Sequence, residues 1–169
     1  MGNFFQTIKK RRSARSFLDR PIEPSKIQKI LRAAISGPSS GGLQAFEIFQ
    51  IRDKKRKENL VQAAHNQEYV NAATVLVFCT NPKRVKAKFG RRGEKLFSTQ
   101  DAAIAAAYAQ LAATSVGLSS IWIGKFQEKL VQKIIRTKLR PVSILAIGYS
   151  HEKPKPKKVR KLKEMVHNV

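Results

Sequence analysis

The chain has 169 residues and a formal net charge of +23, from 34 lysines and arginines against 11 aspartates and glutamates. With 42% hydrophobic residues it can build one core, because a domain of about 150 residues buries about 70% of its unfolded surface. We therefore expect a single domain over residues 1–169. The one cysteine, Cys79, excludes an internal disulfide framework and zinc sites with paired thiolates. It fits a reducing compartment, so we expect a cytoplasmic protein.

The first quarter of the chain predicts two helices and a loop. The apolar residues of 4–8 suit a short helix. Ser25 with Gln28 resembles a capping box, and the apolar residues that follow have helical spacing, so we expect an amphipathic helix over 25–36. Residues 37–42 (GPSSGG) have no periodicity. They predict a loop whose backbone can approach a ligand closely.

The middle of the chain predicts two strands around a helix, followed by a loop. Residues 45–52 alternate as a strand does, and 54–64 suit a polar helix. The run TVLVFCT at 74–80 is continuously apolar and predicts a buried central strand. Residues 83–97 contain many cations, two glycines and a single acid, Glu94. This composition predicts a mobile surface loop.

A long alanine-rich helix is predicted next. Ser98 with Asp101 resembles a helix start, and Gly117 suits its end. The helix is apolar on nearly every face, which implies burial on all sides. Because so short a chain covers such a helix poorly, we expect a second subunit to cover part of it. The segment 102–118 is too short and too polar to span a bilayer, so no membrane is expected.

The remaining residues complete an α+β or α/β domain of roughly four strands. Residues 120–123 and 142–149 predict strands that flank a helix at about 128–137. The tail from His151 is basic and extended around its prolines. No GxGxxG follows a strand and no GxxxxGK[ST] occurs, so the usual dinucleotide and phosphate-loop fingerprints are absent from the sequence.

The reactive residue types form no convincing catalytic or metal site. Cys79 lies in an apolar strand, where the thiolate is disfavoured. His65, His151 and His167 have no carboxylate or second histidine at ligand spacing, so we expect surface roles and no metal. Asp101 suits a helix start or a solvated helix face. With no clear acid, base or nucleophile, an enzyme here needs a cofactor to bring the reactive atom.

The strongest functional feature of the sequence is a set of cationic clusters at residues 9–15, 83–95 and 153–163. They suit either a solvated surface or the capture of an anion, which would be a phosphorylated cofactor or nucleic acid. Aromatic residues are not clearly interleaved with the cations, so nucleic acid remains possible but is not favoured.

Five ordered blocks resemble the flavin-dependent nitroreductase family over essentially the whole chain. They are Arg11-Arg12-Ser13-Ala14-Arg15-Ser16-Phe17 with Ile22, Pro24 and Ile30-Leu31-Arg32-Ala33-Ala34; Gly37-Pro38-Ser39-Ser40-Gly41-Gly42-Leu43-Gln44-Ala45-Phe46; Asn71-Ala72-Ala73 before TVLVF; Asp101 through Val116-Gly117-Leu118 and Ile121-Trp122-Ile123-Gly124; and Pro141 through Ile147-Gly148-Tyr149. A closing segment, 155–161 with Glu164, is also similar.

This resemblance implies an α+β three-layer sandwich, with a central mixed, mainly antiparallel sheet flanked by helices, in a homodimer with flavin sites at the interface. It implies an FMN enzyme in which NAD(P)H gives a hydride to the flavin, and a nitroaromatic or quinone-like acceptor then takes the electrons by an alternating (ping-pong) mechanism. No side chain is expected to be catalytic, because the flavin carries the chemistry. The tail 151–169 would close on the cofactor or on the partner subunit.

The resemblance also implies roles for individual residues. Arg11 and Ser13, with Lys158 or Arg160, would hold the flavin phosphate and ribityl chain. Arg15 would lie near the pyrimidine edge. The full implied cofactor-binding set is Arg11, Arg12, Ser13, Arg15, Pro38, Ser39, Ser40, Gln44, Gln67, Ile123, Gly124, Lys158 and Arg160. Within it, the 38–40 loop would reach the partner's flavin, the backbone at 123–124 would face flavin N5, and position 67 would approach the pyrimidine edge.

Three departures from the family pattern bear on function. Gly42 stands where the family commonly has asparagine, so a side-chain hydrogen bond to the cofactor is missing and flavin affinity is expected to fall. Ala45-Phe46 replaces the usual Pro-Trp. The region 81–97 is short, which implies an open site. The alternatives are a nucleic-acid or polyanion-binding protein on a degenerate flavin scaffold, and a module that stores or senses FMN.

Overall fold

The computed structural model describes residues 4–152 and 159–169; residues 1–3 and 153–158, which include Lys158, lie outside this description. The helices are α1 (Phe4–Lys10), α2 (Pro24–Ser36), α3 (Lys54–Ala63), α4 (Lys83–Arg92), α5 (Ser98–Ser115) and α6 (Glu128–Ile134). The strands are β1 (Phe46–Ile51), β2 (Thr74–Thr80), β3 (Ser119–Ile123) and β4 (Pro141–Gly148). Three short 3-10 turns (Ser40–Gly42, Glu68–Val70 and Leu162–Glu164) and a π-helical turn (Gly93–Phe97) complete the described elements.

The strands form one sheet in the order β1-β2-β4-β3, and all neighbouring strands are antiparallel. Every residue of β2 is buried, which confirms the predicted central strand. On the outer edge of β3, Ser13 forms an isolated parallel bridge with Ser120. The described four-stranded sheet is thus antiparallel throughout rather than mixed, and this bridge lies outside its strands.

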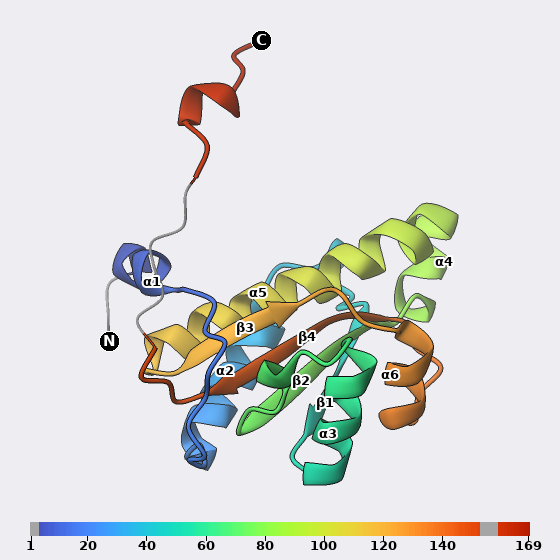
Figure 1. Ribbon diagram of the computed structural model, residues 1–169. Coiled ribbons are helices and arrows are strands. Elements are labelled where there is room, and N and C mark those ends of the chain that lie inside the picture. Colours follow the sequence, from blue (N-terminus) through green and yellow to red (C-terminus); the bar gives the residue numbers. More distant parts are fainter. Residues whose placement is uncertain (1–3, 153–158) are drawn as a thin grey trace.

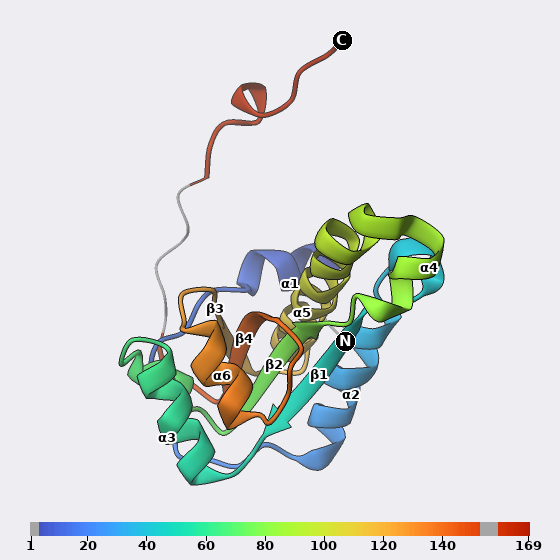
Figure 2. The same cartoon turned by 90° about the vertical axis from the view of Figure 1, so that its right-hand side faces the viewer.

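Helices cover both faces of the sheet (Figures 1 and 2): α2 and α5 lie on one face, and α3 and α6 on the other. Successive strand residues point to opposite faces, so Val75 and Val77 pack on the α3/α6 side while Leu76 and Phe78 pack on the α5 side. This arrangement confirms the predicted three-layer α+β fold.

The predicted capping box at the start of α2 is wrong. The helix begins one residue earlier, at Pro24, with Glu23 at the cap position, and no side chain caps its first turn. Proline suits a first helical position because its missing N–H would be unpaired there in any case.

The predicted mobile loop over 83–97 is also wrong. Residues 83–92 form α4, and a π-helical turn over 93–97 leads directly into α5. Val85 is fully buried, and the rings of Phe89 and Phe97 meet edge to face with centroids 5.2 Å apart. Val85 and Phe89 are four residues apart, as on one face of a helix, but the dense cations around them obscured this spacing.

Helix α5 leaves one side uncovered within a single chain. Its alanines at 102, 105, 106, 109 and 113 are buried, whereas Tyr108 is 41% exposed. The described tail residues 159–169 are all exposed and extend away from the sheet and helices (Figure 1). Among the described residues, no helix is long and apolar enough to cross a membrane.

Candidate functional site

The basic N-terminal segment runs along the edge of β3. Helix α1 ends at Lys10, and the chain then passes beside the strand, where Ser13 bridges Ser120 and the Ala14 amide donates to the Ser120 carbonyl at 3.2 Å. The Ser120 Oγ atom is buried and has no hydrogen-bond partner in the described part of the chain. A buried polar atom without a partner is costly, so this hydroxyl is an unsatisfied group inside the fold next to Ser13.

The three arginines of this segment differ in what their side chains do. Arg12 donates to the carbonyls of Lys9 (2.6 Å) and Arg11 (2.8 Å), so its guanidinium is engaged by backbone. The guanidinium groups of Arg11 and Arg15 form no hydrogen bond or ion pair with other described residues. Two cationic groups at the edge of β3 are therefore available for an anion.

The start of the C-terminal tail contacts the basic N-terminal segment. Glu152 accepts hydrogen bonds from the backbone amides of Arg15 (2.6 Å) and Ser16 (3.1 Å) through one carboxylate oxygen. Further along, Arg160 is exposed, and its partner among the described residues is Glu164, at the carbonyl (2.6 Å) and the carboxylate (3.8 Å). The structure does not bring Arg160 to Arg11 within one chain.

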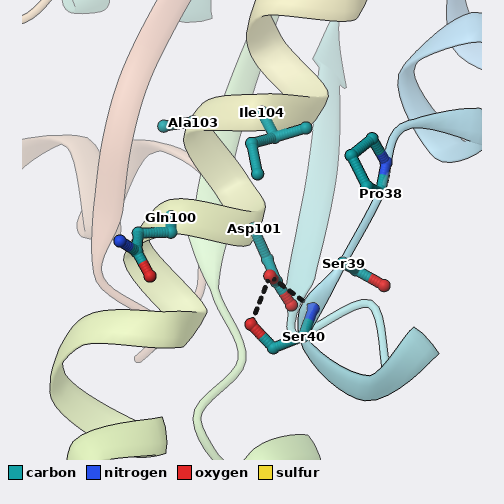
Figure 3. A pocket seen from close by; sticks show the side chains of 7 residues that line it. All are labelled: Pro38, Ser39, Ser40, Gln100, Asp101, Ala103 and Ile104. Carbon is teal, nitrogen blue, oxygen red and sulfur yellow. Dashed lines mark hydrogen bonds between the residues drawn. The ribbon is translucent and has the colours of Figure 1, made fainter. Parts of the chain in front are cut away.

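The loop that contains Pro38, Ser39 and Ser40 is fixed by Asp101 of α5 (Figure 3). One carboxylate oxygen of Asp101 accepts from the amide and the hydroxyl of Ser40, both at 2.9 Å, and the other accepts from the Ala45 amide at 3.0 Å. Asp101 is 1% exposed. Asp101 lies in the first turn of α5, as predicted, but the predicted solvated role is wrong, since the buried carboxylate accepts hydrogen bonds from the loop.

The rest of the loop is held by its own turns. Gly41, Gly42 and Gln44 all have positive φ, at 59°, 72° and 49°. The Gln44 amide donates to Ser39 Oγ at 3.1 Å, and its side-chain nitrogen donates to the Ile35 carbonyl at 2.8 Å. The side chain of Gln44 therefore ties the loop to the end of α2.

A hollow of about 550 Å³ lies between this loop and the start of α5. Its lining consists of Pro38, Ser39, Ser40, Gln100, Asp101, Ala103 and Ile104. Figure 3 shows these residues on the first turns of α5 and on the facing loop.

A third group of predicted residues lies at the end of β3. Ile123 pairs with Ile144 in the sheet, and the exposed Gly124 follows it. Gln67 donates to the Lys125 carbonyl at 2.9 Å and also to the Ala64 carbonyl, while its oxygen accepts from the Tyr69 hydroxyl. Gln67 thus lies beside the loop after β3, and its amide is already engaged.

The predicted residues therefore fall into two places. The N-terminal segment, Gln67 and the 123–124 backbone lie along or near β3, whereas the Pro38–Ser40 loop lies at the first turn of α5. Since Asp101 is near the start of α5 and β3 follows its end, fourteen helical residues separate the two, about 20 Å at 1.5 Å per residue. One chain does not join them into one cavity.

The prediction for Cys79 is confirmed. The thiol is fully buried, and burial raises its pKa to about 12, so the thiolate is disfavoured at neutral pH. In the described part of the chain, no three His, Cys, Asp or Glu side chains gather as a metal site would require.

Comparison with known proteins agrees with this architecture. A sequence model of the Nitroreductase family matches residues 8–71 and 62–149. The NADPH-flavin oxidoreductase of Vibrio harveyi is 35% identical over 140 residues, covering 78% of this chain, and the chain spans only 58% of that protein's length. An FMN reductase (NADPH) of Bacillus subtilis is 30% identical, covering 100% of this chain and 76% of that protein.

The backbone of this chain is also similar to those of solved structures. The structure of the Vibrio harveyi NADPH:FMN oxidoreductase complexed with NAD+ superposes with a TM-score of 0.90 at 28% identity, over 99% of this chain and 77% of that one. The fold, the ordered sequence blocks and the family match agree. The chain belongs to the nitroreductase family.

Proposed function

We propose that this protein is an FMN-dependent oxidoreductase. In this proposal NAD(P)H is the hydride donor, a nitroaromatic or quinone-like compound is the acceptor, and donor and acceptor occupy one open pocket in turn. Relatives named as flavin and FMN reductases support the reaction class. The observation that carries it is the pair of unengaged guanidinium groups, Arg11 and Arg15, beside the edge of β3.

These residues fit the phosphate of FMN. A phosphate monoester carries about −1.5 to −2 charges at neutral pH, and an arginine side chain can bind it through two parallel hydrogen bonds. Arg11 and Ser13 would hold the phosphate and ribityl chain, and Lys158 or Arg160 would add a cation from the tail.

FMN would supply the redox chemistry, and the chain's own groups would bind and orient it. Arg15 would stabilise negative charge that develops at the pyrimidine edge, the kind of electrostatic help that is usually the largest catalytic effect. The backbone at Ile123 and Gly124 would offer an amide donor. Because the Gln67 amide already bonds Lys125, Gln67 would position the loop that carries Gly124 rather than contact the flavin directly.

The same proposal requires two copies of the chain. The Pro38–Ser40 loop lies at the far end of α5 from Ser13, so a second copy would bring its loop to this copy's flavin. A second hollow of about 430 Å³ lies further along the uncovered side of α5, lined by Phe4, Thr7, Ala33, Tyr108, Leu111, Ala112 and Ser115. This apolar lining suits a subunit interface, and the exposed apolar tail residues Val159 and Leu162 would pack on the partner. A reducing compartment, the cytoplasm, suits the free cysteine.

The test is an absorption spectrum of the protein with FMN, followed by anaerobic NADPH. We expect a yellow protein whose flavin bands bleach on reduction. Arg11→Gln should weaken FMN binding about tenfold or more, the usual effect of losing a hydrogen bond to a charged group, whereas the neighbouring exposed Lys10→Gln should change it little. A colourless protein that does not take up added FMN would contradict the proposal and favour the polyanion-binding alternative.

A further inference from the structure

A basic hollow lies at the end of α6, on the opposite side of the sheet from α5. Its volume is about 600 Å³, and its lining consists of Lys129, Gln132, Lys133, Arg136, Thr137 and Lys138. None of the four cationic side chains forms an ion pair with a described residue. The acid at the start of α6, Glu128, instead pairs with Arg140 at 3.0 Å.

The backbone of this hollow is fixed in a turn that usually contains glycine. Arg136 has a φ of 55°, and the Thr137 amide donates to the Gln132 carbonyl at 3.0 Å, the bonding pattern of a glycine-terminated helix. Glycine adopts this conformation without steric cost, whereas arginine does not. The chain therefore places a cation where glycine would stabilise the turn more.

Side chains hold the loop after Arg136 in place. The Gln132 side-chain nitrogen donates to the carbonyls of Lys138 and Leu139, both at 3.0 Å, and the Leu139 amide donates to Thr137 Oγ at 3.2 Å. The cations of the hollow are thus presented by an ordered turn, although their mutual repulsion opposes this arrangement. A bound anion would relieve that repulsion.

The neighbouring helix α3 also has exposed cations. Helices α3 and α6 lie side by side under the sheet (Figure 2), and the Gln127 amide before α6 donates to the Ala63 carbonyl at the end of α3 at 2.8 Å. Lys54 and Arg56 of α3 are exposed and have no ion-pair partner among the described residues. The only large hydrophobic side chain that is exposed on the described α3 and α6 is Leu130.

We propose that the basic hollow of α6 binds phosphate groups of a nucleic-acid backbone, without reading the base sequence. Lysines and arginines that neutralise phosphates supply sequence-independent affinity by releasing counterions. Cations that extend over two helices suit a polymer better than a single small anion. An acidic protein partner or a membrane surface would call for an apolar centre or an apolar helix face, which α3 and α6 do not offer.

Salt dependence of DNA binding tests this proposal. The FMN-saturated protein is titrated with a fluorescent duplex of mixed sequence at several salt concentrations. The hollow variant is Lys129→Gln/Lys133→Gln/Lys138→Gln. A control of equal charge change, Lys29→Gln/Lys83→Gln/Lys95→Gln, removes exposed cations from other elements.

We expect the hollow variant to bind about tenfold or more weaker at 100 mM salt, with a salt slope smaller by about 2 to 3, since each neutralised phosphate contributes about 0.9. The control should stay within about threefold of the parent. An equal loss in both variants would overturn the proposal, because net charge alone would then explain binding. Binding to phosphatidylserine vesicles without binding to DNA would also overturn it.

Arg136→Gly gives an independent readout. Glycine relieves the positive φ, so the thermal unfolding midpoint should rise while DNA affinity falls about threefold to tenfold with a slope loss of about 1. Because this variant is expected to be more stable than the parent, a loss of affinity would not come from unfolding. Unchanged DNA affinity would overturn the role of Arg136 and with it the proposed site.

Discussion

Asp101 fixes the Pro38–Ser40 loop, which in the proposed dimer would reach the cofactor site of the partner copy. Its buried carboxylate accepts three hydrogen bonds, two of them from the backbone amides of Ser40 and Ala45. A buried amide without an acceptor destabilises the folded state, because the amide loses its hydrogen bond to water on folding and gains none in the protein. This single side chain therefore links the conformation of the loop to α5.

Replacing Asp101 should destabilise the protein strongly. We expect Asp101→Ala to lower the free energy of unfolding by about 3 kcal/mol, since two backbone amides lose their acceptor. Ser40→Ala, which removes only the hydroxyl donor, should cost about 1 kcal/mol. Urea unfolding measures both, and an Asp101→Ala protein as stable as the parent would show that the loop does not depend on this carboxylate.

Gly42 can accept the side chain that the family commonly has there. Its φ is +72°, a conformation that asparagine tolerates, and a Cβ added to it would meet no atom within 4 Å. We expect Gly42→Asn to leave stability nearly unchanged and to lower the Kd for FMN about threefold to tenfold, the effect of one added hydrogen bond. Gly117→Asn is the matched control, with φ +79° and equally open space. Equal FMN affinities of the two variants would refute the explanation that Gly42 lacks a hydrogen bond to the cofactor.

At the scale of elements, α4 and the π-helical turn depend on a glycine packed against the preceding helix. A Cβ at Gly93 would lie 2.7 Å from Phe89 Cβ and 3.0 Å from the Val85 carbonyl oxygen. Neither atom can move without shifting α4, so the position admits no larger residue. Gly93 therefore packs within a helical segment, whereas Gly90, with a φ of 53°, kinks α4.

Gly93→Ala should thus lower the thermal stability of the protein. We expect a loss of about 1 to 3 kcal/mol, typical of an overpacked site. The exposed Ala87→Ser on the same helix should cost less than about 0.5 kcal/mol. Thermal unfolding followed by circular dichroism compares the two, and equal midpoints would contradict the packing described for Gly93.

A polar cluster ties the start of α2 to the end of β4. Tyr149 donates to Glu23, Lys26 donates to the Tyr149 hydroxyl at 2.7 Å, and the Arg20 guanidinium lies 4.0 Å from the centre of the Tyr149 ring. The hydrogen bond from Tyr149, with smaller contributions from backbone and Lys26, lowers the pKa of Glu23 to about 2. The ionised carboxylate is therefore favoured in the folded state.

This cluster predicts a pH dependence of stability. Because the folded pKa of Glu23 is below its ordinary value of 4.5, its contribution is complete above about pH 4.5 and is lost as the pH falls toward 2. Tyr149→Phe should be less stable than the parent near neutral pH, and the difference should shrink as the pH falls through that window. Urea unfolding between pH 2 and 7 measures it, and a difference independent of pH would exclude Glu23 as the cause.

For the whole molecule, regular patterns in the sequence were enough to predict the layers but not the contacts that join them. The apolar run of β2 and the periodicity of α2 correctly predicted a buried strand and an amphipathic helix. Helix α4 was missed because its few apolar residues lie among cations. Asp101 was misjudged because its partners lie about sixty residues earlier, in a loop, and no local pattern records such a contact.

In the candidate site too, the sequence motif was predictable but the contacts of its side chains were not. The N-terminal motif was recognisable, and the structure places it on the edge of β3 beside the polar Ser120. Sequence gave no sign that Arg12 is engaged by backbone or that Gln67 already bonds Lys125. Whether a side-chain donor is already bonded to a backbone carbonyl depends on its neighbours in the folded chain. Residues that look equivalent in the motif therefore differ in their capacity to bind a ligand.

The central claim is that arginines of one copy and the loop of another hold one flavin between them. Arg11→Gln and Ser39→Glu homodimers should each lose tight FMN binding. After the two variants are unfolded, mixed and refolded, half of the dimers should be mixed, each with one intact site. The account predicts that about a quarter of all sites regain tight binding by FMN titration. No recovery on mixing, or tight binding by the Ser39→Glu homodimer, would contradict it.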